Sequence, residues 1–169
     1  LEIANYAIVL GVVLILASIV SVVFGRFIDK VGKLNFVPPA AVVMFAGLIG
    51  MFFVRKPVSV AIAGTVMMGG YMLVTAALSA TIRDFTPTDR VGQFQGIRMI
   101  FAVMLPMIIG PWIGAAVIKN SGTTYVDLGT VKNVPTPAIF LAAAIVLLTI
   151  AVPLVFLKRR EKQAKIAVK

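Results

Sequence analysis

The residue types best suited to chemistry gather in a short charged run after the first long apolar stretch. It reads Gly25-Arg26-Phe27-Ile28-Asp29-Lys30-Val31-Gly32-Lys33. Gly25 and Gly32 allow a tight reversal of the chain. Asp29 can face the positive end of a neighbouring helix, and Lys30 and Lys33 favour anionic headgroups. The chemistry predicted here is ion pairing and anchoring.

Three arginines in a second charged segment are the available partners for that aspartate. Arg83, Arg90 and Arg98 lie between the third and the fourth apolar stretch. Opposite charges within a few ångströms stabilise one another. We therefore expect Asp29 to pair with Arg98 or Arg83 and to hold two segments together.

Enzymatic and metal chemistry are not expected. The chain contains no His and no Cys, which excludes a Cys or His metal site, a cysteine nucleophile and a disulfide framework. No ionisable residue lies inside a long apolar stretch, and isolated hydroxyls have no base to activate them. We predict no catalytic residue, no metal and no cofactor.

The composition predicts an all-α membrane protein. Of the 169 residues, 60% are hydrophobic and 13% are charged, and the mean hydropathy is +1.06. A stretch of about 20 apolar residues is needed to cross a hydrocarbon core. The predicted spans are residues 3–25, 37–54, 57–82, 99–118 and 138–157, which form one bundle over 1–157, followed by a basic tail at 158–169.

The positive charges predict the orientation and the partners. The net charge is +10, and its clusters between apolar runs favour lipid headgroups over nucleic acid. The first and third connections and the tail together hold 12 Lys and Arg, against 4 at the other ends of the spans. Cytoplasmic segments carry this excess, so we expect the carboxyl terminus inside. Leu1 in place of an initiator Met predicts a piece of a longer chain.

Polar and aromatic side chains inside the spans are the candidates for a solute pathway. Met68, Tyr71, Thr75 and Ser79 lie on one face of the third span. The alternative is that the hydroxyls bond the carbonyls of their own helix. Trp112 is a further candidate, and its alternative is an interfacial anchor. The second and fifth spans lack such residues and are predicted to be peripheral.

The fourth span contains helix-breaking residues. Pro106, Gly110 and Pro111 are predicted to kink it near the midplane, because proline removes a backbone hydrogen bond. Such breaks mark binding regions or hinges in transporters. A kink that serves packing alone is the alternative.

The first charged run resembles the G-x-x-x-D-[RK]-x-G-[RK] signature of the major facilitator superfamily, and all five signature positions match. Pro87, Arg90 and Gly92 resemble a second loop pattern of that superfamily. The resemblance implies part of a twelve-helix secondary transporter that works by alternating access, with the aspartate in a conformational lock. It also implies that the first, third and fourth spans border the pathway.

The resemblance leaves the exact assignment open. Helices eight to twelve of a bacterial sugar-type permease or symporter in the inner membrane are favoured over helices two to six. The implied partners are a small-molecule substrate, the lipid bilayer and the remainder of the transporter. The alternative is a noncatalytic membrane scaffold or assembly subunit. A channel is disfavoured because no ring of charge or filter repeat is present.

Overall fold

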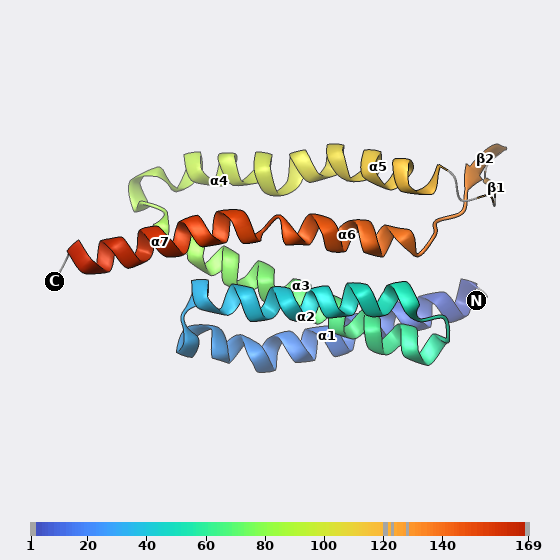
Figure 1. Cartoon of the computed structure of the whole chain (residues 1–169), viewed down its shortest axis with the longest axis horizontal. Helices are drawn as coiled ribbons and strands as arrows, with labels where there is room; N and C mark the ends of the chain where they lie inside the picture. Colours follow the sequence, from blue (N-terminus) through green and yellow to red (C-terminus); the bar gives the residue numbers. More distant parts are fainter. Residues whose placement is uncertain (1–2, 120–121, 123, 128, 168–169) are drawn as a thin grey trace.

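The described residues form seven α-helices and one β-hairpin (Figure 1). The structure, a computed structural model, describes the backbone of residues 3–119, 122, 124–127 and 129–167, and their side chains other than those of 3–6, 29, 127 and 160–167. In chain order the elements are α1 (Ile3–Val31), α2 (Lys33–Phe53), α3 (Pro57–Phe85), the 3-10 turn η1 (Thr88–Arg90), α4 (Val91–Met99), the π-helical turn η2 (Ile100–Met104), α5 (Leu105–Ile118), β1 (Thr124–Asp127), β2 (Thr130–Asn133), α6 (Ala138–Leu148) and α7 (Ala151–Ala167).

Five helical segments are long and apolar enough to cross a membrane, so the predicted all-α membrane fold is confirmed. They are Ala7–Ile28, Lys33–Phe53, Pro57–Phe85, Thr88–Ile118 and Ala138–Arg159. They run up and down along one common direction (Figure 1). We call the end that holds the α1–α2 turn, the α3–α4 connection and α7 the basic end. The α2–α3 turn and the hairpin lie at the opposite end.

The helices extend beyond the predicted spans at the basic end. α1 continues to Val31 and α2 begins at Lys33, so the charged run that was predicted as a loop is helical on both sides of a single residue, Gly32. The predicted spans ended where the charges begin. Charged side chains can continue a helix beyond the hydrocarbon, because their heads reach water there.

The closest packing in the bundle joins α2 and α3. A Cβ added to Gly70 would lie 2.5 Å from the Met44 nitrogen, and one added to Gly47 would meet the Met67 backbone. Small residues of this kind let helix backbones approach closely within a membrane. α2 was predicted to be peripheral because it lacks polar side chains. One face of it carries buried residues such as Val37, while Val42 on the other face is exposed, which agrees with a helix at the periphery of the bundle.

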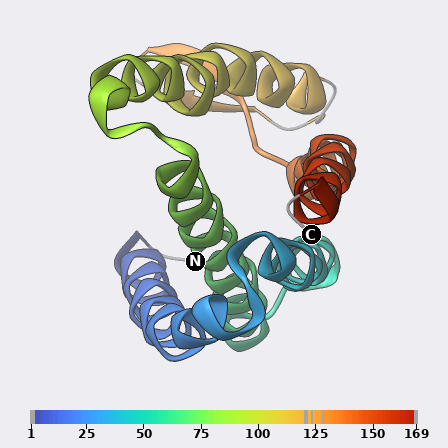
Figure 2. The ribbon, with the colours of Figure 1, turned by 90° about the vertical axis from the view of Figure 1, so that its left-hand side faces the viewer.

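α4, η2 and α5 form one long helical segment at the edge of the bundle, which contacts α6 (Figure 2). All residues from 91 to 118 are described, and none of them is buried. The central core lies elsewhere, among Ile28, Phe36, Val37, Ala40, Leu73, Val74 and Ala77 of α1, α2 and α3. The fourth span therefore has large apolar faces that the rest of this chain does not cover.

Proline causes two local irregularities in the helices. Before Pro106 the backbone forms the π-helical turn η2, in which the Leu105 N–H donates to the carbonyl of Ile100, five residues back. α5 then continues through Gly110 and Pro111 without interruption. The fifth span, by contrast, divides into α6 and α7 at Thr149 and Ile150, ahead of Pro153.

Candidate functional site

A glycine forms the turn within the charged signature. Gly32 has φ +93° and ψ 130°, a conformation that side chains with a Cβ rarely adopt. Its N–H donates to the Ile28 carbonyl, and its own carbonyl accepts from the N–H groups of Asn35 and Phe36. With these hydrogen bonds α1 ends and α2 begins on either side of this one residue. The next residue, Lys33, is thereby fixed at the first turn of α2.

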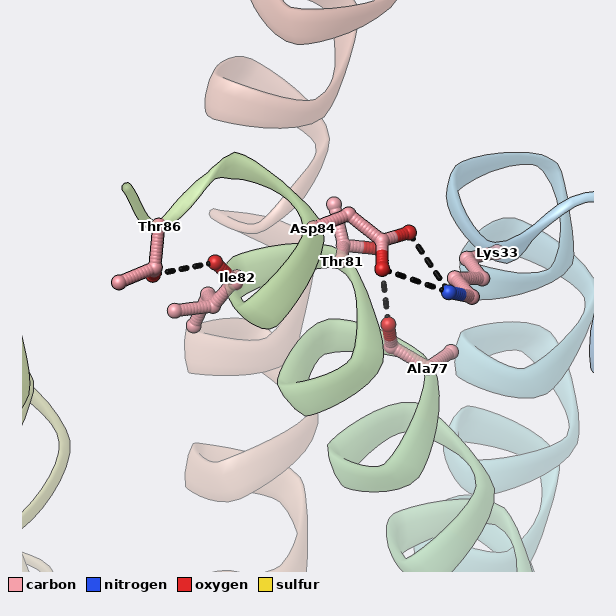
Figure 3. A network of polar contacts seen from close by, with 6 residues as sticks. All are labelled: Lys33, Ala77, Thr81, Ile82, Asp84 and Thr86. Atoms are coloured by element: carbon pink, nitrogen blue, oxygen red, sulfur yellow. Dashed lines mark hydrogen bonds and ion pairs between the residues drawn. The ribbon is translucent and has the colours of Figure 1, made fainter. Parts of the chain in front are cut away.

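Lys33 forms an ion pair with Asp84 across the basic end of the bundle (Figure 3). The Lys33 Nζ donates to both carboxylate oxygens of Asp84, at 2.6 and 2.8 Å. α2 and α3 are antiparallel here, so Asp84 lies near the positive end of α2 and Lys33 near the negative end of α3. Each charge therefore has the sign that the neighbouring helix dipole favours.

Two of the three predicted partners of Asp29 contact other residues. The side chain of Asp29 lies outside the described side chains, so its pairing with Arg83 or Arg98 stays a prediction. Arg98 donates from Nη2 to the Ser79 hydroxyl at 2.7 Å. Arg90 lies 3.5 Å from Asp89, its exposed sequence neighbour. Gly25 and Lys30 lie on the last turns of α1.

A cavity at the basic end separates α3 from the start of the fourth span. Its volume is about 540 Å³, and Ser79, Arg83, Thr86, Gln95 and Arg98 supply its polar lining. Apolar residues such as Ala76 and Phe94 supply the rest. We call it the arginine cavity. Two predicted lock residues thus lie around one space.

A second cavity brings together three predicted pathway and kink residues from different helices. Tyr71 of α3 lines it with Pro106 and Gly110 of α5. Its volume is about 630 Å³, and α2 and α6 complete its walls with residues such as Met44 and Ala143. Tyr71 is 47% exposed, and its phenolic hydroxyl is the polar side-chain group in an otherwise apolar lining. We call this space the tyrosine cavity.

Three other residues on the predicted face of α3, Met68, Thr75 and Ser79, do not line the tyrosine cavity. Met68 is half-buried. Thr75 is half-buried too, and its hydroxyl donates to the carbonyls of Tyr71 and Met72, at 2.9 and 3.0 Å. This is the alternative that the sequence left open for Thr75, because the hydroxyl satisfies its own helix.

Trp112 lies away from the tyrosine cavity. It is 78% exposed and lines a separate cavity of about 820 Å³ at the opposite end of the bundle, together with Tyr125, Lys119 and Lys132. The hairpin supplies part of this wall, since Tyr125 and Lys132 are directly paired across its strands. An exposed tryptophan beside lysines at a span end matches an interfacial anchor.

Two residues of the basic end, Asp84 and Ser79, were not predicted from the sequence to make the contacts that they make. Asp84 follows Arg83 directly, and only the latter was considered as a partner. A usable signal was available: α2 begins and α3 ends on the same side of the membrane, so a cation at the start of one and an acid at the end of the other are close.

The comparison with protein families gives one match that covers nearly the whole chain. Residues 2–169 match the Major Facilitator Superfamily. Comparisons with curated proteins and with solved structures give no significant match. Five spanning segments and the charged signature at the basic end agree with the family match. The chain is an integral membrane protein and belongs to the major facilitator superfamily of transporters.

Proposed function

We propose that the chain is part of a secondary active transporter that moves a small solute by alternating access and catalyses no reaction. The observation that carries this proposal is the family match over residues 2–169. The tyrosine cavity supports it further, because Tyr71, Pro106 and Gly110 border one space between spanning helices. Discontinuities of helical geometry near such spaces are common in transporters.

The lining of the tyrosine cavity favours a solute with an apolar face. A sugar is our first choice of substrate, because the carbon-bound hydrogens of a sugar ring pack against aromatic rings such as that of Tyr71. One phenolic hydroxyl satisfies few of the hydroxyl groups of a sugar. The remaining hydrogen bonds would come from helices outside this bundle.

Further transmembrane helices are expected to complete the pathway. The apolar faces of η2 and α5 are uncovered, and Trp112, Met107 and Phe101 are among their exposed residues. Exposed apolar surface is stable against lipid or against another helix. We favour an assignment to helices eight to twelve of a permease or symporter in a bacterial inner membrane.

We infer that the basic end faces the cytoplasm and carries the conformational lock. The excess of Lys and Arg at this end supports that orientation. In the proposed lock, Asp29 pairs with Arg83 or Arg98 in one transport state, and Lys33 and Asp84 hold α2 to α3. Gly25, Lys30, Gly32 and Arg90 complete the charged turns.

Uptake of labelled solutes into proteoliposomes tests the proposed function. The protein is reconstituted from its full reading frame, and a panel of sugars and other small polar solutes is compared with empty liposomes. We expect saturable uptake of at least one solute and exchange of that solute in both directions. A failure of every solute to exchange, together with stable association with a partner membrane protein, would support the scaffold alternative.

A further inference from the structure

We propose that the arginine cavity is a binding site for an anionic phospholipid, with the phosphate held by Arg98 and Arg83 and an acyl chain lying along the apolar wall. The site lies between α3 and α4 at the basic end, on the other side of α3 from the core. Lipid binding at this site does not depend on which solute is carried.

Arg98 has spare hydrogen-bond donors among the described side chains. Its guanidinium has five N–H donors, and its one hydrogen bond to a described side chain is that to the Ser79 hydroxyl at 2.7 Å. Arg98 is half-buried, so its charge is partly removed from water. A planar guanidinium in such a place matches the oxygens of a phosphate, which accept two parallel hydrogen bonds.

The hydrogen bonding of Ser79 differs from that of several other hydroxyls on the helices. Thr65, Thr75, Thr81, Thr86 and Thr149 donate to carbonyls of their own helices. Ser79 instead accepts a hydrogen bond from Arg98. An accepting hydroxyl keeps its own proton for a further acceptor. Ser79 can therefore donate to the same anion that Arg98 binds.

The positive charges at the arginine cavity are not balanced by carboxylates of the described side chains. Asp84 is paired with Lys33, and Asp89 lies beside Arg90. Among the described side chains, no carboxylate lies within ion-pair distance of Arg83 or Arg98. In a transport state in which Asp29 does not pair with them, Arg83 and Arg98 are two cations that share a cavity and repel one another, and a bound anion removes that repulsion. The cavity therefore favours a ligand with negative charge.

The position of the cavity favours a lipid over a free anion. The uncharged stretch from Met99 to Ile118 has 20 residues. It spans about 30 Å as a helix, which is the thickness of the hydrocarbon core. Arg98 directly precedes this stretch and so lies at the depth of the headgroups. Ala76, Ala80 and Phe94 continue the lining with apolar surface, which suits an acyl chain.

Native mass spectrometry of the detergent-purified protein tests the site. The protein is titrated with phosphatidylglycerol or with phosphatidylcholine, which has no net charge, and the lipid-bound fraction of the folded, monodisperse protein is measured. We expect Arg98→Gln and Arg83→Gln each to weaken phosphatidylglycerol binding by roughly tenfold, because each removes a charge-assisted contact. Arg98→Lys should weaken it less.

The matched control is Arg26→Gln, which removes one exposed positive charge from the same end of the bundle outside the cavity lining. We expect Arg26→Gln to bind phosphatidylglycerol as the unchanged protein does. Equal weakening by Arg26→Gln and Arg98→Gln would mean general attraction to charge and would overturn the proposal. Unchanged binding in Arg83→Gln and Arg98→Gln would overturn it as well.

A competition experiment separates the two sources of phosphate. Millimolar inorganic phosphate is added to the phosphatidylglycerol complex, and the lipid-bound fraction is measured again. We expect no displacement, because the apolar wall contributes to lipid binding alone. Full displacement would assign the cavity to a free anion and would overturn the lipid proposal. Arg83 is exposed and makes no hydrogen bond or ion pair with a described side chain, so Arg83→Gln gives a folded variant if Arg98→Gln does not.

Discussion

The Lys33 ammonium contacts both carboxylate oxygens of Asp84, 51 positions away in the sequence. The pair joins the first turn of α2 to the last turn of α3 (Figure 3). It is the long-range ion pair found among the described side chains. Its location, directly after the glycine turn of the charged signature, connects that signature to the packing of α2 on α3.

The pair is expected to contribute little to stability and more to the choice between conformations. The side chains of Lys33 and Asp84 are 26% and 50% exposed, and ion pairs this accessible contribute up to about 1 kcal/mol. We predict that Lys33→Glu lowers uptake, because it sets two carboxylates against each other. The exchanged double variant Lys33→Asp/Asp84→Lys should recover uptake, measured in proteoliposomes.

Arg26→Glu is the control for this prediction, since Arg26 is exposed at the same end of the bundle, lies outside the pair and the proposed lock, and should leave uptake unchanged. A double-mutant cycle with Lys33→Gln and Asp84→Asn isolates the coupling energy of the pair. If the exchanged variant is as inactive as Lys33→Glu, the pairing has no role in transport.

The turn at Gly32 leads to a prediction about stability alone. We expect Gly32→Ala to lower the free energy of unfolding by about 1–3 kcal/mol, because its φ of +93° is strained for any residue with a Cβ. The nearest atom to the added Cβ would be the Asn35 Nδ2 at 3.7 Å, so no clash contributes. Thermal unfolding in detergent measures the loss. An unchanged melting temperature would contradict the strain argument.

The close approach of α2 and α3 predicts a strong effect of a small substitution. Gly70→Ala should destabilise the bundle by about 1–3 kcal/mol, since its Cβ would meet backbone atoms of Met44 that cannot rotate away. The matched control is Gly11→Ala in α1, where the added Cβ meets nothing within 4 Å. That control should be neutral or stabilising by up to about 1 kcal/mol. Equal melting temperatures for the two variants would contradict the packing argument.

The sequence was sufficient for the spans and insufficient for their contacts. Uninterrupted apolar stretches identify transmembrane helices because hydrocarbon leaves few alternatives. Charges gave less reliable bounds, since α1 and α2 continue through Lys30 and Lys33 as helices. The composition of α2 predicted a peripheral position and no particular partner, whereas Gly47 allows it to pack closely against α3. Hydropathy alone does not reveal such an approach, because a close helix contact depends on which glycines face one another.

The candidate site could be predicted only in part from the sequence, because its contacts depend on how the helices are arranged around one another. The face of α3 that carries Tyr71 follows from helical periodicity. That Tyr71 shares a cavity with Pro106 and Met44 depends on how α5 and α2 are arranged around α3. In the same way, Asp84 became visible as the partner of Lys33 only once the ends of two helices were known to meet.

The proposed lock gives a prediction for Asp29 that is independent of the Lys33 pair. We predict that Asp29→Lys lowers uptake, because it sets a third cation beside Arg83 and Arg98 where the proposed lock requires an anion. Labelling of single cysteines introduced at the two ends of the bundle measures the balance between inward-facing and outward-facing states. Uptake and labelling that are both unchanged in Asp29→Lys would exclude Asp29 from the lock.

Tyr71 and Trp112 distinguish a solute pathway from membrane anchoring. Tyr71 borders the tyrosine cavity, whereas Trp112 is 78% exposed at the opposite end of the bundle. We predict that Tyr71→Ala raises the KM for uptake by roughly tenfold, the effect of losing one aromatic contact and one hydrogen bond. Tyr71→Phe removes the hydrogen bond alone and should raise KM less.

Trp112→Ala should leave KM unchanged and lower the amount of protein inserted in the membrane, measured on blots of membrane fractions. The reverse pattern, with KM sensitive to Trp112 and insensitive to Tyr71, would move the pathway to the cavity beside the hairpin.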